Sequence, residues 1–334
     1  MKKSLLVFVT ATLLLLTSCQ PKQYHKHESV IFGTVYHVTY ASTENLQNGI
    51  EENLAKFDLS LSTFNPKSTL SSFNQSGTKP FDLSADPWML KVVKESIHFS
   101  ELSQGAFDIT VGPLVNLWGF GTKERSNPSQ KEVDSIRAFV GYQKLKLDGS
   151  KLSKSDPRIQ LDCSAIAKGY ACDVIAEYLR SQGVTDFLVE IGGEMTLGGR
   201  NPEGKPWNIG INKPVDDSTS TNMDWGYKLK ITDKGIATSG NYRNFYIKDG
   251  KKYAHTINPK TGKPIVQSLL SATIVAKDCL SADALATACM VMGTDSALAL
   301  IERLPDAECL LLSLDEKGDQ ITSMSSGMKQ FLSE

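Results

Sequence analysis

The hydrophobic residues of this chain switch repeatedly between the two-residue period of a strand and the 3.6-residue period of a helix. Residues 30–40 alternate as a strand does, with Gly33 inside the run. Residues 88–105 and 281–292 have helical spacing, and Ser281 is expected to cap the second of these helices. Hairpins are mixed with helices instead of alternating strictly with them, so the pattern favours an α+β fold over a doubly wound sheet.

Length and charge narrow the classes of protein further. The chain has 334 residues, which suits one large domain or two closely packed ones, and no linker divides residues 29–334. The formal net charge is −1, and no basic stretch follows the N-terminus. We therefore expect a globular domain over residues 29–334 and no nucleic-acid partner.

The N-terminus has the features of a secretion signal. Lys2 and Lys3 precede an apolar run over residues 5–16, which is shorter than the ~20 residues that a membrane helix needs. The run ends in Leu-Thr-Ser-Cys, which resembles a bacterial lipoprotein processing site. We expect residues 1–18 to be a signal peptide, Cys19 to be lipidated and residues 19–28 to form a polar tether. The mature protein would then be a membrane-anchored lipoprotein of the cell envelope that faces the periplasm. A secretory signal followed by an unmodified cysteine is the alternative.

Residues 161–170, Leu-Asp-Cys-Ser-Ala-Ile-Ala-Lys-Gly-Tyr, lie between a strand-like segment and a helical one. Asp162 or Ser164 could cap the first N–H groups of that helix. Helix starts attract anions, and Lys168 just inside the helix would add a full positive charge. The run could therefore hold a phosphate, although an ordinary strand-to-helix turn with a solvated lysine has the same spacing.

Two oxygen-bearing residues, Asp283 and Thr287, are four positions apart in the helix expected over residues 281–292. They share one face of that helix, and small alanines beside them leave room for a ligand. Hard cations such as Mg²⁺ prefer oxygen ligands and keep positions for water and phosphate. A solvated helix face would carry the same residues.

His255 precedes a tight turn that contains Pro259 and Gly262. Its pKa near neutrality would suit a general base. A hydrogen-bonded structural histidine is the alternative interpretation.

Taken together, several runs resemble the ApbE-type FAD:protein FMN transferases, bacterial flavin transferases that are often lipoproteins. The matching runs appear in the family's order between about residues 30 and 293: 33–36, 61–74, 105–114, 161–170, 189–194, 237–240, 255–262 and 282–287. The resemblance implies an α+β, T-fold-related architecture with largely antiparallel sheets and flanking helices.

The resemblance also implies roles for individual residues, with FAD as substrate and Mg²⁺ as cofactor. Ala165, through its backbone carbonyl, would bind the metal with Asp283 and Thr287, and Lys168 would lie near the diphosphate of FAD. The other residues implied at the flavin nucleotide are Phe32, Phe64, Ala106, Phe107, Asp108, Asp162 and Ile257. Phe32 stands where relatives usually have methionine, Phe64 where many have tyrosine, and Asn258 where an aspartate usually follows the histidine.

The implied reaction is a phosphoryl transfer. A threonine or serine hydroxyl of an acceptor protein attacks the FMN-side phosphorus of FAD, AMP leaves, and FMN stays attached through a phosphodiester. Lys168 and the metal would stabilise the developing charge, and His255 is the candidate base. The family suggests subunits of membrane redox pumps or periplasmic reductases as acceptors. A Mg²⁺-dependent hydrolase that splits FAD to FMN and AMP, and a flavin-binding lipoprotein without turnover, are the alternatives.

Overall fold

The computed structural model describes residues 23–121, 127–213, 225–241, 245–248, 251–266 and 268–333. The expected signal peptide and Cys19 lie outside these residues. Within the described ranges, no helix has both the length and the apolar composition needed to cross a membrane.

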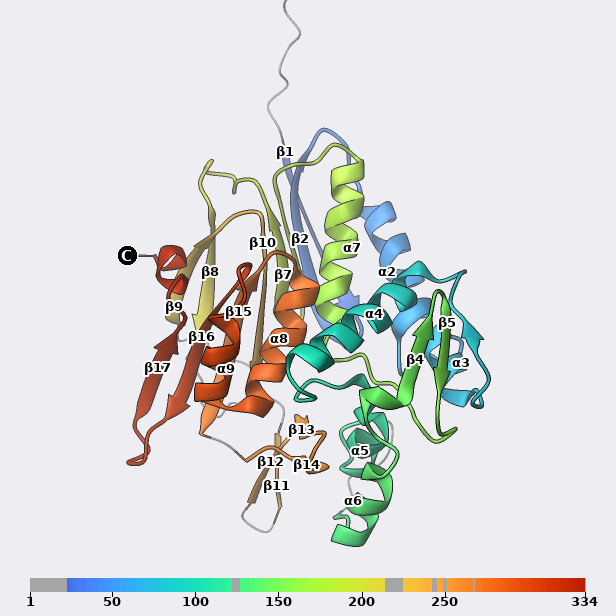
Figure 1. The fold of residues 1–334 in the computed structure, drawn as a ribbon. Helices are drawn as coiled ribbons and strands as arrows, with labels where there is room; N and C mark the ends of the chain where they lie inside the picture. The colour runs from blue at the N-terminus through green and yellow to red at the C-terminus, as the bar shows by residue number, and fades with distance from the viewer. Residues whose placement is uncertain are drawn as a thin grey trace, which may run out of the picture.

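An eight-stranded sheet organises the molecule, and every pair of neighbouring strands in it is antiparallel (Figure 1). Its strands, in spatial order, are β1 (Gln23–Ile31), β2 (Thr34–Ser42), β6 (Phe187–Ile191), β7 (Glu194–Gly198), β10 (Lys234–Gly240), β15 (Leu269–Ala276), β16 (Ala307–Leu314) and β17 (Gln320–Met324). The prediction of an α+β fold with largely antiparallel strands is therefore confirmed.

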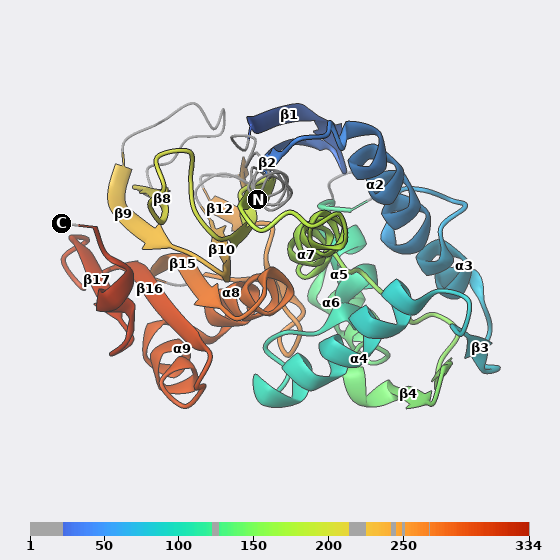
Figure 2. The same cartoon turned by 90° about the horizontal axis from the view of Figure 1, so that it is seen from above.

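Both faces of this sheet are covered. Figure 2 shows α7 (Ala167–Ser181), α8 (Cys279–Met292) and α9 (Thr294–Ile301) on one face, and the hairpin of β8 (Trp207–Asn212) and β9 (Trp225–Ile231) on the other. Neighbouring residues of β15 pack on opposite faces of the sheet. Ile274 lies in the core beneath the helices, and Val275 lies in the core beneath β8 and β9. A strand buried on both faces has a continuous apolar sequence, which is why residues 269–276 show little alternation.

A second region packs beside the helices and completes the site described below. It contains α2 (Gln47–Leu61), α3 (Thr69–Gln75), α4 (Pro87–Leu102), α5 (Gly112–Leu117), α6 (Gln130–Arg137) and a small sheet of β3 (Phe81–Asp82), β5 (Lys151–Lys154) and β4 (Leu145–Asp148). The hairpins β11 (Phe245–Lys248) with β12 (Lys251–Ala254) and β13 (Ile257–Asn258) with β14 (Lys263–Pro264) lie at the same end of the molecule as α5 and α6 (Figure 1). Ile257 joins these parts through a small core that it shares with Leu114 of α5 and Val133 of α6.

The N-terminal boundary of the folded domain needs correction. Residues 23–28, expected to belong to the tether, are part of β1, which begins at Gln23 and pairs with β2 along its whole length. Its polar side chains are part of the fold: the ring of His25 stacks on Tyr40, and His27 Nε2 lies 2.8 Å from the hydroxyl of Tyr36. The polar composition that suggested a tether is that of an edge strand.

The strand expected over residues 30–40 is also two strands of one hairpin. Phe32 and Gly33 form its two-residue turn, with φ of +52° and +73°. Positive φ at both central residues matches the twist of a hairpin, and glycine adopts it without strain. Gly33, which interrupts the alternating hydrophobic residues, therefore marks the position at which the chain reverses direction.

Candidate active site

The helices α7 and α8 touch at a point where only glycine fits. A Cβ added at Gly169 would lie 2.3 Å from the backbone oxygen of Cys279 and 2.8 Å from Cβ of Asp283. The absence of a side chain lets α8 approach the first turn of α7 at backbone distance. This contact places Asp283 at the start of α7.

Asp283 supplies the cap that the local sequence does not. The N–H of Gly169 donates to Asp283 Oδ2 at 3.0 Å, across 114 positions of sequence. The helix begins at Ala167, so neither Asp162 nor Ser164 caps it as expected. Asp162 Oδ1 instead accepts a hydrogen bond from the N–H of Ser164 within the preceding turn. The start of α7 therefore meets a carboxylate of the protein itself.

Lys168 forms a close ion pair that the sequence did not indicate. Its Nζ lies 2.5 Å from Glu194 Oε1, with 31% of the lysine side chain exposed and 8% of the glutamate side chain. Burial acts to lower the pKa of Lys168, but the charges of Glu194 and Asp283 outweigh it, so the lysine is protonated. The ammonium is fixed beside α8 and is not the solvated lysine of the alternative interpretation.

Two buried acids share this one ammonium group. Burial raises the pKa of both Glu194 and Asp283, while Lys168 acts to lower both. Two acids therefore face a single ammonium, and their raised pKa values show that the buried cluster disfavours two negative charges at once. Glu194 Oε2 is buried and has no hydrogen-bond partner among the described residues. A buried charge that is only partly compensated is costly, and it favours a site that receives a further cation.

A third buried acid, Asp173, joins the same two helices one turn further along α7. Its Oδ1 accepts from the N–H of Cys279 at 3.0 Å and from the hydroxyl of Thr196 at 2.6 Å, and its Oδ2 accepts from the N–H of Leu280 at 2.8 Å. Burial raises the pKa of Asp173 to about 6. These bonds fix the start of α8 against α7 and β7, and Asp278, not Ser281 as expected, is the N-cap of α8.

The residues predicted to bind a metal are arranged around this contact. Thr287 follows Asp283 by one helical turn, and its hydroxyl lies 3.3 Å from that of Ser239 on β10. Ala165 is half-buried in the turn before α7. No group of three or more histidine, cysteine or acidic residues able to hold a metal occurs in the described part of the chain. A cation here would use Asp283 with hydroxyl and carbonyl oxygens, which are ligands that suit Mg²⁺.

The segment with Ala106, Phe107 and Asp108 lies against the turn that precedes α7. The N–H of Asp162 donates to the carbonyl of Ile109 at 2.7 Å, which ties the two predicted flavin-binding segments together. Ala106 and Phe107 are buried, and the ring of Phe107 packs edge-on against Phe99. The ring of Phe107 therefore belongs to the core.

Asp108 lines a pocket of about 310 Å³. Its carboxylate accepts hydrogen bonds from the N–H and hydroxyl of Thr110 and from the N–H of Tyr142, at 2.6–2.8 Å. Burial raises the pKa of Asp108. The other residues that line the pocket are Gln104, Gly105, Arg137, Val140, Gly141, Tyr142, Gln143, Pro259 and Lys260. The pocket thus joins this segment to the turn that follows His255.

That turn is held by the side chain at which the chain departs from the family. Asn258 Oδ1 accepts from the N–H groups of Lys260 and Thr261 at 2.9 and 3.2 Å, as an aspartate would. The indole of Trp118 donates to the carbonyl of Gly262 at 2.8 Å. His255 is half-buried between β12 and β13, and Ile257 is buried. The turn is therefore rigid beside His255, and asparagine replaces the carboxylate without loss of these bonds.

The two predicted flavin-binding phenylalanines differ in their surroundings. The centroid of the Phe32 ring lies 5.7 Å from that of Phe57 on α2, so this ring already packs on the protein. Phe64 is 69% exposed in the segment between α2 and α3. Phe64 therefore presents an open face for a planar ring.

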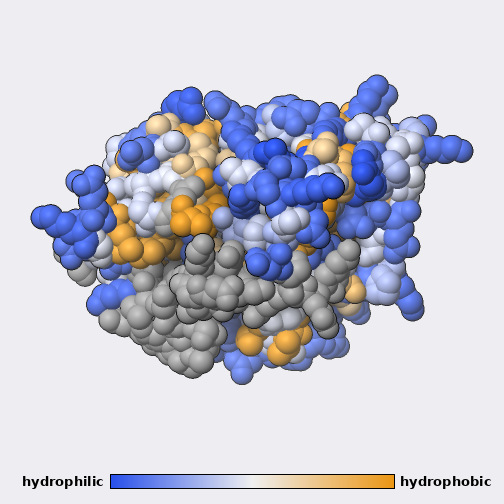
Figure 3. All heavy atoms as spheres, turned by 90° about the horizontal axis from the view of Figure 1, so that it is seen from below, coloured by the Kyte–Doolittle hydropathy of each residue, from blue (hydrophilic) through white to orange (hydrophobic). Residues whose placement is uncertain are grey.

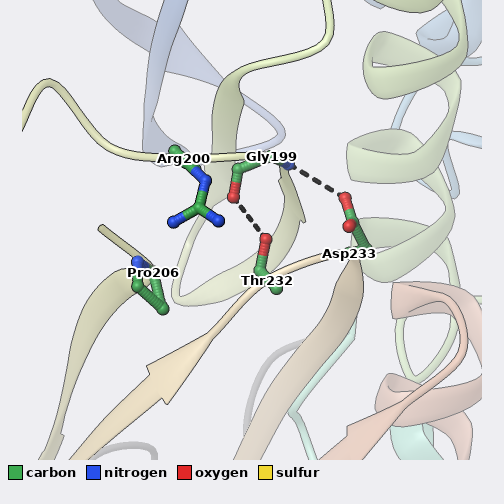
Figure 4. Close-up of a pocket in the computed structure, with 5 residues that line it drawn as sticks. All are labelled: Gly199, Arg200, Pro206, Thr232 and Asp233. Atoms are coloured by element: carbon green, nitrogen blue, oxygen red, sulfur yellow. Dashed lines mark hydrogen bonds between the residues drawn. The ribbon is translucent and has the colours of Figure 1, made fainter. Parts of the chain in front are cut away.

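A separate pocket of about 170 Å³ contains none of the predicted residues. Gly199, Arg200, Pro206, Thr232 and Asp233 line it (Figure 4). Two hydrogen bonds join residues of its lining, because the N–H of Gly199 donates to Asp233 and the hydroxyl of Thr232 donates to the carbonyl of Gly199. Lys168, Asp283 and Thr287 lie instead at the α7–α8 contact, and Ile257 packs against α5. Figure 3 views the molecule from below, where hydrophobic patches lie among hydrophilic residues.

Known proteins match this chain over nearly its whole length. A model of the ApbE family matches residues 32–311. A FAD:protein FMN transferase of Vibrio cholerae is 40% identical over 333 residues, which cover 97% of each chain. The structure of flavin transferase ApbE from Vibrio cholerae has a TM-score of 0.84 at 39% identity and covers 93% of this chain and 100% of that one. Flavinyl transferase ApbE of Pseudomonas stutzeri, in its apo form, has a TM-score of 0.82 at 33% identity, with 93% and 97% covered. The range matched by the family model contains every predicted site residue of the folded domain.

Proposed function

This chain belongs to the ApbE family, and from that membership we propose that it transfers the FMN part of FAD to a threonine or serine hydroxyl of an acceptor protein and releases AMP. The observation that supports this most is the ammonium of Lys168, held beside Glu194 and Asp283 at the start of α7. A fixed, partly exposed cation next to a helix start suits the diphosphate of FAD.

The chemistry needs stabilisation of charge and activation of a poor nucleophile. The acceptor hydroxyl attacks the FMN-side phosphorus, the bond from that phosphorus to the AMP oxygen breaks, and the hydroxyl proton passes to a base. Lys168 offsets the charge that develops on the phosphate oxygens. His255, beside the turn fixed by Asn258, is the candidate base.

We further propose that the site uses Mg²⁺. The residues that would hold it are Asp283, Thr287 and the carbonyl of Ala165, and all three present oxygen. The two buried acids that share the ammonium of Lys168 support this choice, because a further cation would favour their charged forms. When bound, Mg²⁺ would neutralise phosphate oxygens of FAD. The aromatic face of Phe64 and the pocket beside Asp108 are the candidate contacts of the nucleotide.

We place the protein in the cell envelope, anchored through a lipidated Cys19 and facing the periplasm. The apolar run over residues 5–16 and the residues before Cys19 support this placement. Subunits of membrane redox pumps and periplasmic reductases are the acceptors that we propose.

Product analysis tests the function. The protein is incubated with FAD, Mg²⁺ and a periplasmic acceptor domain that bears the target threonine, and all products are weighed by mass spectrometry. We expect the acceptor to gain the mass of FMN less water, with one AMP released per acceptor. Free FMN with AMP and an unmodified acceptor would identify a hydrolase, and intact FAD would identify a binding protein.

A further inference from the structure

Glu194 is a buried acid that the proposed function places in contact with neither FAD nor the metal, and its position is set by the backbone. It is the first residue of β7, directly after the turn of Gly192 and Gly193, whose φ values are +65° and +106°. The N–H of Gly193 donates to Glu190 Oε1, and Ile191 pairs with Glu194 across the hairpin. The hairpin therefore directs this carboxylate at α7.

The contact with Lys168 is arranged to hold that side chain in one place. Lysine has a long, flexible side chain, so an unpaired ammonium would move among several positions. The thiol of Cys172, one turn after Lys168, donates to the carbonyl of Glu194 at 3.2 Å. Strand β7 and helix α7 are thus joined by a second contact next to the ion pair.

Stability alone does not explain Glu194. The charge of Asp283 also acts on Lys168, so the cluster places two buried acids beside a single ammonium. Glu194 Oε2 is buried without a hydrogen-bond partner among the described residues, whereas buried polar groups kept for stability are normally satisfied. A buried polar atom without a partner destabilises the fold, so we expect Glu194 to have a role in the candidate active site.

We infer that Glu194 is a positioning residue: its carboxylate fixes the ammonium of Lys168 at the start of α7. The inference rests on the proposed function, in which that ammonium meets the diphosphate of FAD. Glu194 itself does not touch the substrate. It acts by limiting the positions of Lys168, and placement within a fraction of an ångström is worth large factors in rate.

A double-mutant cycle tests the inference. Glu194→Gln, Lys168→Met and the double variant are compared with the wild-type protein for FMN transfer, for thermal unfolding, and for FAD affinity from flavin fluorescence without Mg²⁺. Glu194→Gln should lower kcat by about tenfold or more, while KM and the Kd for FAD stay equal or fall because a negative charge is lost. In the Lys168→Met background, the same change should lower kcat no further.

Two more variants separate position from charge. Glu194→Asp keeps the charge but shortens the side chain by about 1.5 Å. A positioning role therefore predicts a lower kcat, whereas a role of charge alone predicts an unchanged kcat. Glu177→Gln makes the same charge change on the exposed face of α7 and should leave kcat unchanged.

Several results would overturn the inference. They are an unchanged kcat in Glu194→Gln, an equal loss of kcat with and without Lys168, and full activity in Glu194→Asp. If the wild-type protein transfers FMN and one of these results is found, the proposed function stands and only the role of Glu194 is refuted. A wild-type protein that transfers no FMN refutes both.

Discussion

Lys168 contributes both to the packing of the fold and to the candidate active site. A buried ammonium without partners would lose its proton or destabilise the protein, and Glu194 and Asp283 prevent both. The sequence identified Lys168 and Asp283 as site residues, but it assigned no role to Glu194. The partners of this cluster are 26 and 115 positions from Lys168, and no local spacing rule links residues so far apart.

The proposed role of His255 as the base can be tested by replacing this one residue. If it takes the proton of the attacking hydroxyl, His255→Ala should slow FMN transfer by about 10²–10⁴-fold with little change in FAD affinity. Single-turnover transfer and flavin fluorescence measure the two quantities. Asn258→Asp, which keeps the oxygen that accepts from Lys260 and Thr261, is the matched control and should retain the rate. An unchanged rate in His255→Ala would exclude the role of base.

At the scale of elements, the contact of α7 with α8 decides the geometry of the site. Sequence rules for helix caps search the nearest residues, and they selected Asp162 and Ser164 for α7. The cap is Asp283, because Gly169 lets α8 approach closely enough for its side chain to reach the helix start. Periodicity predicted α8, but it could not predict which helix lies against it.

Gly169→Ala tests this contact. Alanine favours a helix over glycine by up to ~1 kcal/mol, but its Cβ would clash with the backbone of Cys279, and overpacking costs about 1–3 kcal/mol. We expect a net loss of stability in urea unfolding and at least a tenfold loss of FMN transfer, since Asp283 must move. Gly77→Ala is the control, because nothing lies within 4 Å of its added Cβ. A Gly169→Ala protein as stable and active as wild type would refute the close contact.

The pH dependence of stability tests the second link between these helices. The pKa of Asp173 is raised from 3.8 to about 6 in the folded state, so the folded protein binds this proton more tightly than the unfolded chain. Its contribution to stability is therefore complete below about pH 4 and is lost as the pH rises through 6, by about 3 kcal/mol in total.

The comparison with Asp173→Asn isolates this group. The free energy of unfolding of the wild type minus that of the variant should fall by this amount between about pH 4 and pH 7, and stay level above it. Chemical unfolding at several pH values measures the difference. A difference that does not change with pH would show that Asp173 titrates normally.

At the scale of the whole molecule, the mixture of hairpins and helices in the sequence predicted the fold class but not the strand order. The central sheet brings together strands from both ends of the chain, with β1 at one edge and β17 at the other. Such long-range pairing depends on the helices that cover the sheet, and residue periodicity does not encode it. The edge strand β1 was mistaken for tether for another reason: it pairs locally with β2, but its sequence is polar and lacks the apolar alternation of a strand.

Two shortened chains test the corrected boundary and the proposed anchor. A chain that begins at Gln23 keeps all of β1 and lacks Cys19, so it should leave the membrane fraction and still transfer FMN at the wild-type rate. A chain that begins at Ser29 loses most of β1 and should melt roughly 5 °C or more lower, since several ladder bonds and the His25–Tyr40 stack are removed. If the chains that begin at Gln23 and Ser29 melt at the same temperature, residues 23–28 do not contribute to the folded domain. If the chain that begins at Gln23 stays in the membrane fraction, anchoring by Cys19 is refuted.

The mass of the acceptor protein after incubation with FAD, measured with wild-type enzyme and with Asp283→Asn in parallel, tests the central claim most directly. Asparagine can still accept from the N–H of Gly169 and removes one of two acids that share Lys168, so this variant should fold. We predict that the wild type adds one FMN per acceptor in the presence of Mg²⁺, and that Asp283→Asn does so at least about 100-fold more slowly. An acceptor that gains FMN equally fast with both proteins would contradict the assignment of the α7–α8 contact as the site of transfer.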